Sequence, residues 1–212
     1  MVNLSGRFNV ESTRGDGYVR VDFIARDGNY EPVGFDQILA DKYDFVVLQV
    51  SAGVLLDPPV IKQAHSVIRR ICDVISESGA VPVLYEHFVP DILVENQDLS
   101  GKQDLVTELC VQAAAENKAR LAPCGAVWKV AASQKGQDYL RSPDDIHANL
   151  RGNYLLACCV YAALTGDSPV GNKVNHEKYD ITSEDARYFQ QVTWDQYKKR
   201  TEEQKQLVLQ KK

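Results

Sequence analysis

The sequence lacks several features that would assign it to a broad class at once. No hydrophobic stretch is long enough to span a bilayer, and the first residues contain no apolar segment of the signal-peptide kind. Acidic and basic residues are intermixed along the 212 residues, and the net charge is -5. These features argue against membrane insertion and against nucleic acid as a partner. As written, the sequence predicts a cytoplasmic protein; loss of an N-terminal leader would make it periplasmic or secreted.

Motifs for nucleotides and metals are also missing. No strand is followed by a glycine-rich loop that could cradle a phosphate, which argues against a flavin- or nucleotide-binding domain. The five cysteines are odd in number and lie mostly inside apolar patterns, at positions 72, 110, 124, 158 and 159. Such cysteines are expected to be buried, reduced thiols. We therefore expect no metal and no cofactor, and the sequence leaves the oligomeric state open.

The chain does contain enough apolar residues for one sizeable core, because 44% of it is hydrophobic. Residues 1–17 mix small and polar types without periodicity and are expected to be irregular. Residues 18–24 alternate between apolar and polar, which predicts a half-exposed, peripheral strand. Residues 45–50 form a short continuous apolar run, which is typical of a central parallel strand buried on both faces.

Helices and strands alternate after this run. Residues 57–59, Asp-Pro-Pro, and the one-sided apolar spacing that follows predict a helix that ends near residues 78–79. Residues 81–85 and 120–123 predict two more short strands with an amphipathic helix between them, and a short helix follows at 124–132. Strands and helices that alternate at this spacing are typical of a parallel sheet. We therefore predict a three-layer α/β fold with a flavodoxin-like parallel sheet flanked by helices.

Two longer helices complete the chain. Residues 150–164 are apolar nearly all round and should pack on the sheet. Thr182 or Ser183 is expected to cap a last helix before the sequence turns polar. We expect residues 1–197 to form one domain and residues 198–212 to form a polar, solvated helical tail.

An acid and a histidine stand three residues apart just before the helix at 150–164. Asp144 can hold one imidazole nitrogen of His147 while the other faces outward, an arrangement that makes histidine a general base. Asp145 offers a competing partner. A histidine or an acid at the start of a helix can also serve only as a cap.

Sites in open parallel sheets gather beyond the carboxyl ends of the strands. That rule draws attention to Gln49 after the first core strand, and to Glu86 and His87 after the second. We interpret Glu86 and His87 as rim residues rather than metal ligands, because no second histidine or cysteine stands at ligand spacing.

Three stretches resemble the SGNH or GDSL hydrolases, a superfamily of esterases and lipases with a flavodoxin-like sheet. Residues 44–49, Asp-Phe-Val-Val-Leu-Gln, look like the third block of the family. Asp-x-x-His at 144–147 with Gly-Asn-Tyr-Leu-Leu-Ala at 152–157 is similar to the fifth block. Residues 165–171 and 185–194 look like the tail common in bacterial members. Together these stretches span most of the chain.

The resemblance implies roles for individual residues. His147 would be the general base, Asp144 its orienting acid, and Gln49 an oxyanion donor. Gly6 would be the second-block glycine whose amide helps the oxyanion hole. The family places its serine nucleophile in a Gly-Asp-Ser or Gly-Asn-Ser turn after an N-terminal strand. In this sequence no N-terminal strand is followed by such a turn. The nucleophile is therefore unknown, since nothing around Ser51 supplies the tight turn that exposes a serine, and the N-terminal strand is expected to be missing or altered.

Two hypotheses follow, and whether the chain is an enzyme stays open between them. The first is an SGNH-type serine esterase that acts on esters, O-acyl carbohydrates among them, and is inactive as written for want of the nucleophile. The alternative is a non-catalytic relative that uses the old cleft to bind a glycan or a protein. The expected small-molecule partner is an ester or a glycan.

Overall fold

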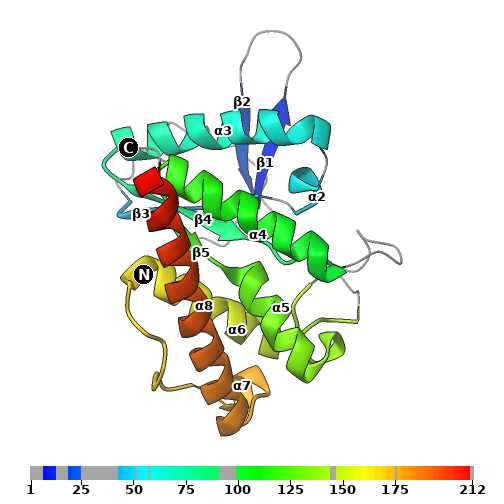
Figure 1. The fold of residues 1–212 in the computed structure, drawn as a ribbon. Coiled ribbons are helices and arrows are strands. Elements are labelled where there is room, and N and C mark those ends of the chain that lie inside the picture. Colours follow the sequence, from blue (N-terminus) through cyan, green and yellow to red (C-terminus); the bar gives the residue numbers. More distant parts are fainter. Residues whose placement is uncertain are drawn as a thin grey trace.

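A three-stranded parallel sheet lies at the centre of the computed structural model (Figure 1). Its strands are β3 (Phe45–Val50), β4 (Val81–Glu86) and β5 (Arg120–Ala122), with β4 in the middle. Both strand pairs are parallel, and Val47 is opposite Val83 in the register of β3 and β4. The structure describes residues 7–12, 19–24, 43–50, 52–56, 58–90, 99–143, 147–174 and 176–210.

The helices predicted to begin near residues 58, 124, 150 and 183 do begin there. The helix that follows β4 begins at Leu99 and is longer than its apolar pattern suggested. The last helix includes residues 198–210, which were predicted to form a helical tail. In chain order, the helices of the described residues are α2 (Ala52–Leu55), α3 (Pro58–Glu77), α4 (Leu99–Glu116), α5 (Cys124–Lys135), the 3-10 helix η2 (Gln137–Tyr139), α6 (Leu150–Thr165), α7 (His176–Tyr179) and α8 (Ser183–Gln210).

These helices cover both faces of the sheet (Figure 1). Along β3, Val46 and Leu48 belong to a buried cluster that also contains side chains of α3 and α4. Phe45 and Val47 pack against a second cluster, formed mainly by α5, α6 and α8. Because alternate side chains of a strand point to opposite faces, a strand covered on both sides is apolar throughout. The predicted three-layer α/β fold is therefore confirmed.

A separate two-stranded sheet corrects the expectation for the N-terminal part. β1 (Arg7–Ser12) pairs antiparallel with β2 (Val19–Ile24), and Phe8 is opposite Phe23. The peripheral strand predicted at 18–24 is present, but the prediction that residues 1–17 are all irregular is wrong for β1. The apolar alternation of β1 is too short to stand out in the sequence, and the strand is stabilised by a partner that local pattern does not show.

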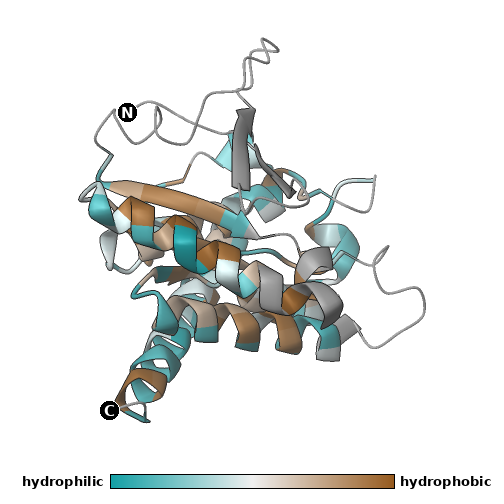
Figure 2. Cartoon of the chain, turned by 90° about the horizontal axis from the view of Figure 1, so that it is seen from above, coloured by the Kyte–Doolittle hydropathy of each residue, from teal (hydrophilic) through white to brown (hydrophobic). Residues whose placement is uncertain are grey.

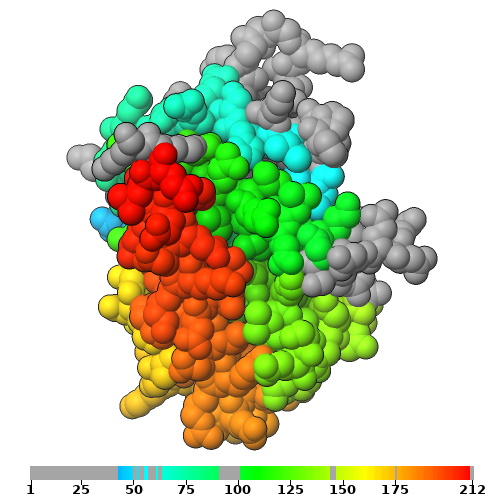
Figure 3. Space-filling model, in the orientation of Figure 1, coloured from blue at the N-terminus to red at the C-terminus, as the bar shows by residue number. Residues whose placement is uncertain are grey.

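The last helix links the two faces of the molecule. α8 continues without a break through residues 198–210, which the sequence analysis set apart as a tail. Leu207 packs against the cluster of α3 and α4, and the C-terminal part of α8 lies against α4 (Figure 3). Much of the C-terminal part of α8 is hydrophilic, with a hydrophobic band close to its end (Figure 2). Of the helices in the described ranges, none combines the length and apolar character needed to cross a membrane.

Candidate functional site

His147 lies at the end of a loop whose two flanking segments, residues 140–142 and 147–149, are joined by backbone hydrogen bonds. We call these paired segments the neck. The Ser142 amide donates to the His147 carbonyl at 2.7 Å, and the Asn149 amide donates to the Leu140 carbonyl at 2.9 Å. Arg141 and Ala148 form an antiparallel bridge between these two bonds. The imidazole of His147 is exposed at the end of this neck. Backbone hydrogen bonds thus join the described ends of this loop, and His147 at one of them is an exposed residue.

Asn149 joins this neck to α6. Its side-chain oxygen accepts the Gly152 amide at 3.0 Å, which makes it the N-cap of the helix. Its side-chain nitrogen donates to the carbonyls of Tyr139 and Arg141, each at 3.0 Å. The cap is therefore Asn149 and not His147. The sequence analysis missed this role, although an asparagine immediately before an apolar helix is a recognised signal.

His87 reaches the same part of the molecule from the end of β4. Its half-buried ring is close enough to His147 for the charge of that residue to act on it. Burial is the larger influence that lowers the pKa of His87, and the charge of His147 lowers it further. Both influences favour the neutral form of the His87 imidazole. The structure brings together two histidines that lie far apart in the sequence.

The orientation of the His87 ring is determined by its neighbours. Nδ1 is in contact with the Phe88 carbonyl oxygen, and since a carbonyl only accepts, Nδ1 carries the proton. Nε2 is then left as an acceptor. The ring stacks on Phe88 at 4.8 Å, and Phe88 stacks on buried Trp128 at 4.0 Å with nearly parallel planes. The stack connects the site to the core under α5.

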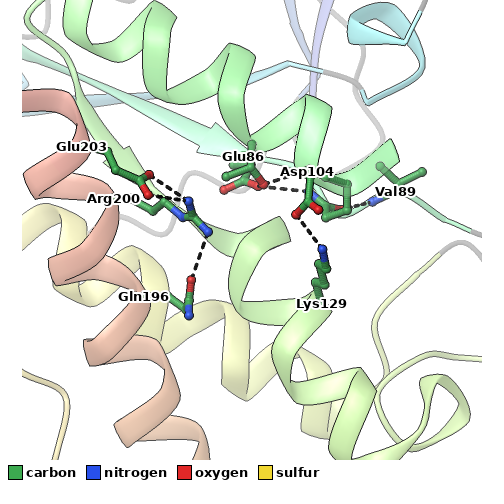
Figure 4. A network of polar contacts seen from close by, with 9 residues as sticks. Glu86, Val89, Asp104, Lys129, Gln196, Arg200 and Glu203 are labelled. Atoms are coloured by element: carbon green, nitrogen blue, oxygen red, sulfur yellow. Dashed lines mark hydrogen bonds and ion pairs between the residues drawn. The ribbon is translucent and has the colours of Figure 1, made fainter. Parts of the chain in front are cut away.

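Glu86 corrects the rim interpretation. It is 0% exposed, whereas His87 beside it is half-buried. Its Oε1 accepts from Thr107 Oγ1 at 2.5 Å and from Gln103 Nε2 at 3.0 Å. The side chain therefore lies under α4 in the interior (Figure 4), and the sequence showed no sign of this because its partners come from another element.

Burial raises the pKa of Glu86 to about 7. The Thr107 hydroxyl and the positive charge of Arg200 act in the opposite direction. Arg200 belongs to α8, where its guanidinium binds Glu203 at 2.8 Å and Gln196 at 3.4 Å (Figure 4). A carboxyl group with a pKa near 7 is a mixture of acid and carboxylate at neutral pH.

The other predicted site residues are placed only in part. Gln49 is exposed near the carboxyl end of β3, at the same edge of the sheet as the end of β4. Asp144, Asp145, Gly6 and Ser51 lie outside the described residues. Within the described part of the chain, no group of three or more His, Cys, Asp or Glu side chains is placed to bind a metal ion.

Known structures share this fold. A DUF4886 family protein from Bacteroides uniformis ATCC 8492 is 18% identical, with a TM-score of 0.63 over 82% of this chain and 71% of that chain. An SGNH hydrolase candidate from Slackia heliotrinireducens is 20% identical, with a TM-score of 0.51 over 61% of this chain and 70% of that chain. No protein-family model and no curated protein matches the sequence. The likeness shows an SGNH hydrolase-like fold, as the resemblance of the sequence predicted.

Proposed function

We propose that the chain carries the base side of an SGNH-type ester hydrolase site, with His147 as general base and Asp144 as its orienting acid. The observation that carries this is the backbone neck, which presents an exposed imidazole beside the carboxyl end of β4. Gln49 would donate to the oxyanion. O-acyl carbohydrates are the substrate class to test first. The one Gly-Asp-Ser of these 212 residues, at 166–168, follows α6 rather than an N-terminal strand, and Gly-Asn-Ser does not occur. The chain by itself should therefore not turn over esters.

An activity assay paired with a serine-reactive probe tests this proposal. The purified chain should hydrolyse p-nitrophenyl acetate no faster than buffer with an inert protein, and a fluorophosphonate probe should label no serine. A serine whose labelling disappears in His147→Ala but persists in His176→Ala would overturn the predicted inactivity and identify the nucleophile. His176 is a suitable control because it belongs to α7, where its Nδ1 contacts the Ile181 carbonyl oxygen before α8.

A second function is favoured by the missing nucleophile turn together with the exposed His147 and Gln49. We propose as the alternative that this edge binds a glycan or a protein without chemistry, and O-acetylated oligosaccharides are the probe for the glycan case. Calorimetry should show binding that weakens at least tenfold in His147→Ala, which is about 1.4 kcal/mol. Equal affinity in the variant, or no heat at millimolar ligand, would contradict the glycan form of this alternative.

A further inference from the structure

The Thr107 hydroxyl has one proton and two acceptors within reach. Oγ1 lies 2.5 Å from Glu86 Oε1 and 2.9 Å from the Gln103 carbonyl oxygen. A hydroxyl donates a single hydrogen bond, so it serves only one of the two at a time. When Glu86 is charged, it accepts the hydrogen bond that the Thr107 hydroxyl donates. When Glu86 is protonated, it can itself donate to Oγ1, and Thr107 then donates to the Gln103 carbonyl. The direction of hydrogen bonding along α4 therefore depends on the protonation of Glu86.

Gln103 connects this exchange to the segment after β4. Its Nε2 donates to Glu86 Oε1, and its Oε1 accepts the Val89 amide at 2.7 Å. Val89 lies two residues beyond His87, so one side chain holds both ends of the short segment that carries the imidazole. A change in the charge of the Glu86 carboxyl therefore alters the hydrogen bond from Gln103 Nε2, and a movement of the Gln103 amide alters the hydrogen bond from the Val89 amide.

α5 packs closely against the segment from Glu86 to Val89, so that the segment has little free space around it. A Cβ atom added to Gly125 would overlap Gln103 Nε2 and would lie 2.8 Å from both Glu86 Oε1 and the His87 carbonyl oxygen. Ordinary contacts of a Cβ are longer, so the backbone of α5 is pressed directly against the network. A shift in hydrogen bonding is therefore passed on to neighbours rather than absorbed by empty space.

A positively charged side chain of α8, Arg200, acts on the hydrogen-bond network of Glu86, Thr107 and Gln103. Arg200 is the charged side chain that favours the carboxylate form of Glu86, while burial favours the neutral acid. Glu86 Oε2 and Arg200 Nε are both buried, and neither has a hydrogen-bond partner within the described residues. The polar and titratable groups around Glu86 are Tyr85 of β4, Gln103, Thr107 and Cys110 of α4, Cys124 and the Ala126 amide of α5, Arg200 of α8 with Gln196 and Glu203, and the Asp104–Lys129 pair (Figure 4).

We propose that Glu86 is a positioning residue of the candidate site, whose protonation reverses the Thr107 hydrogen bond and thereby shifts the segment that carries His87. Arg200 sets the pH at which this reversal occurs, so the C-terminal helix adjusts the edge of the site. The positioning role rests on the proposed function, since it takes the His87 and His147 edge as the site. The hydrogen-bond reversal does not rest on it.

NMR of the full chain tests the reversal through the Val89 and Ala126 amides and the His87 ring. From about pH 5 to about pH 9, all three signals should show a midpoint near 7 that belongs to Glu86. In Glu86→Gln that midpoint should vanish and leave the separate titration of His87. Arg200→Gln should move the midpoint upward by about one pH unit, because a nearby positive charge that favours the carboxylate is removed. Lys198→Gln, an exposed charge on the same helix, should leave it in place.

The outcomes test the hydrogen-bond reversal, the positioning role of Glu86 and the proposed function separately. Unchanged midpoints in Glu86→Gln overturn the reversal. Should that variant fail to fold, the absence of a common midpoint near 7 in the Val89 and Ala126 amides of the wild type does the same. An unmoved midpoint in Arg200→Gln overturns the role of Arg200. If the amides titrate with Glu86 but the His87 ring does not, the positioning role is wrong. Ester turnover that does not depend on His147, together with no glycan binding and with the three midpoints as expected, would contradict the proposed function and leave the reversal standing.

Discussion

His87 and His147 differ in their surroundings, and they lie close enough for the charge of His147 to act on His87. His87 is half-buried, with one nitrogen committed to the Phe88 carbonyl, whereas His147 is exposed. A proton on His147 disfavours a second proton on His87, since like charges repel at short range. Burial and the neighbouring charge thus both favour the neutral form of the His87 ring.

Removal of His147 should raise the pKa of His87. In His147→Ala the repulsive charge is gone, while burial still holds the pKa of His87 below its ordinary value, so the pKa should rise without reaching that value. NMR titration of the His87 ring protons measures it. His176→Ala serves as the control and should change nothing. An unmoved His87 in His147→Ala would mean that the two rings do not share a site.

Glu86 should make the stability of the fold depend on pH. Its pKa is raised from 4.5 to about 7 in the folded state, so the folded protein holds this proton more tightly than the unfolded chain does. The resulting stability is fully present below about pH 4.5 and is lost as pH rises through about 7. The shift corresponds to about 3 kcal/mol.

Urea unfolding at several pH values checks this expectation. Wild type should lose stability between about pH 4.5 and about pH 7, beyond what other groups contribute, and Glu86→Gln should lack that part of the decline. Identical slopes in the two proteins across this window would show that Glu86 titrates alike in the folded and unfolded chains.

At the scale of elements, the local sequence pattern was sufficient to predict a helix or strand wherever a few neighbouring residues determine its structure. The apolar run of β3, the proline start of α3 and the polar start of α8 each contain their signal within a few residues. For α8 the structure shows Thr182 Oγ1 accepting the Asp185 amide at 3.0 Å, as the capping pattern predicted. β1 was missed because a short alternating strand depends on its partner.

Side chains that meet across elements were beyond the sequence. Asp144 and His147 form a local motif, and a motif can be found without a fold. Glu86 was interpreted as a rim residue because nothing nearby in the sequence marks it as buried; its partners Thr107 and Arg200 come from α4 and α8. His87 was set aside for want of a second histidine, which the fold supplies from the loop before α6.

The junction of α6 with the His147 neck should be sensitive to a single methyl group. A Cβ on Gly152 would overlap the Leu140 carbonyl oxygen and lie 2.8 Å from a ring carbon of Trp128. Gly152→Ala should therefore cost on the order of 2 kcal/mol and displace the neck, with a visible shift of the His147 ring signals. Ala157→Gly, on the exposed side of α6, should cost about 1 kcal/mol through helix propensity alone and leave those signals in place. A Gly152→Ala protein with unchanged stability and spectrum would refute the tight junction.

At the scale of the whole molecule, two clusters share one three-stranded sheet, and buried cysteines report on both. Cys72 and Cys110 lie in the cluster of α3 and α4. Cys124, Cys158 and Cys159 lie in the cluster of α5, α6 and α8, and all five thiols are free. Because each face of the sheet needs its own cover, loss of one layer would expose strands that the other layer also needs. The two layers should therefore unfold together.

Thiol labelling tests this cooperation. The native protein should react with Ellman's reagent only slowly, because the thiolate is the reactive form and burial raises the pKa of Cys72 and Cys158 to about 12. In moderate denaturant all five thiols should react in one phase, at a rate that follows global unfolding. Mass spectrometry of partly labelled samples should then find chains with either no label or five. A separate early phase confined to Cys72 and Cys110 would show instead that the α3 and α4 layer opens on its own, and that the sheet keeps its other cover when it does.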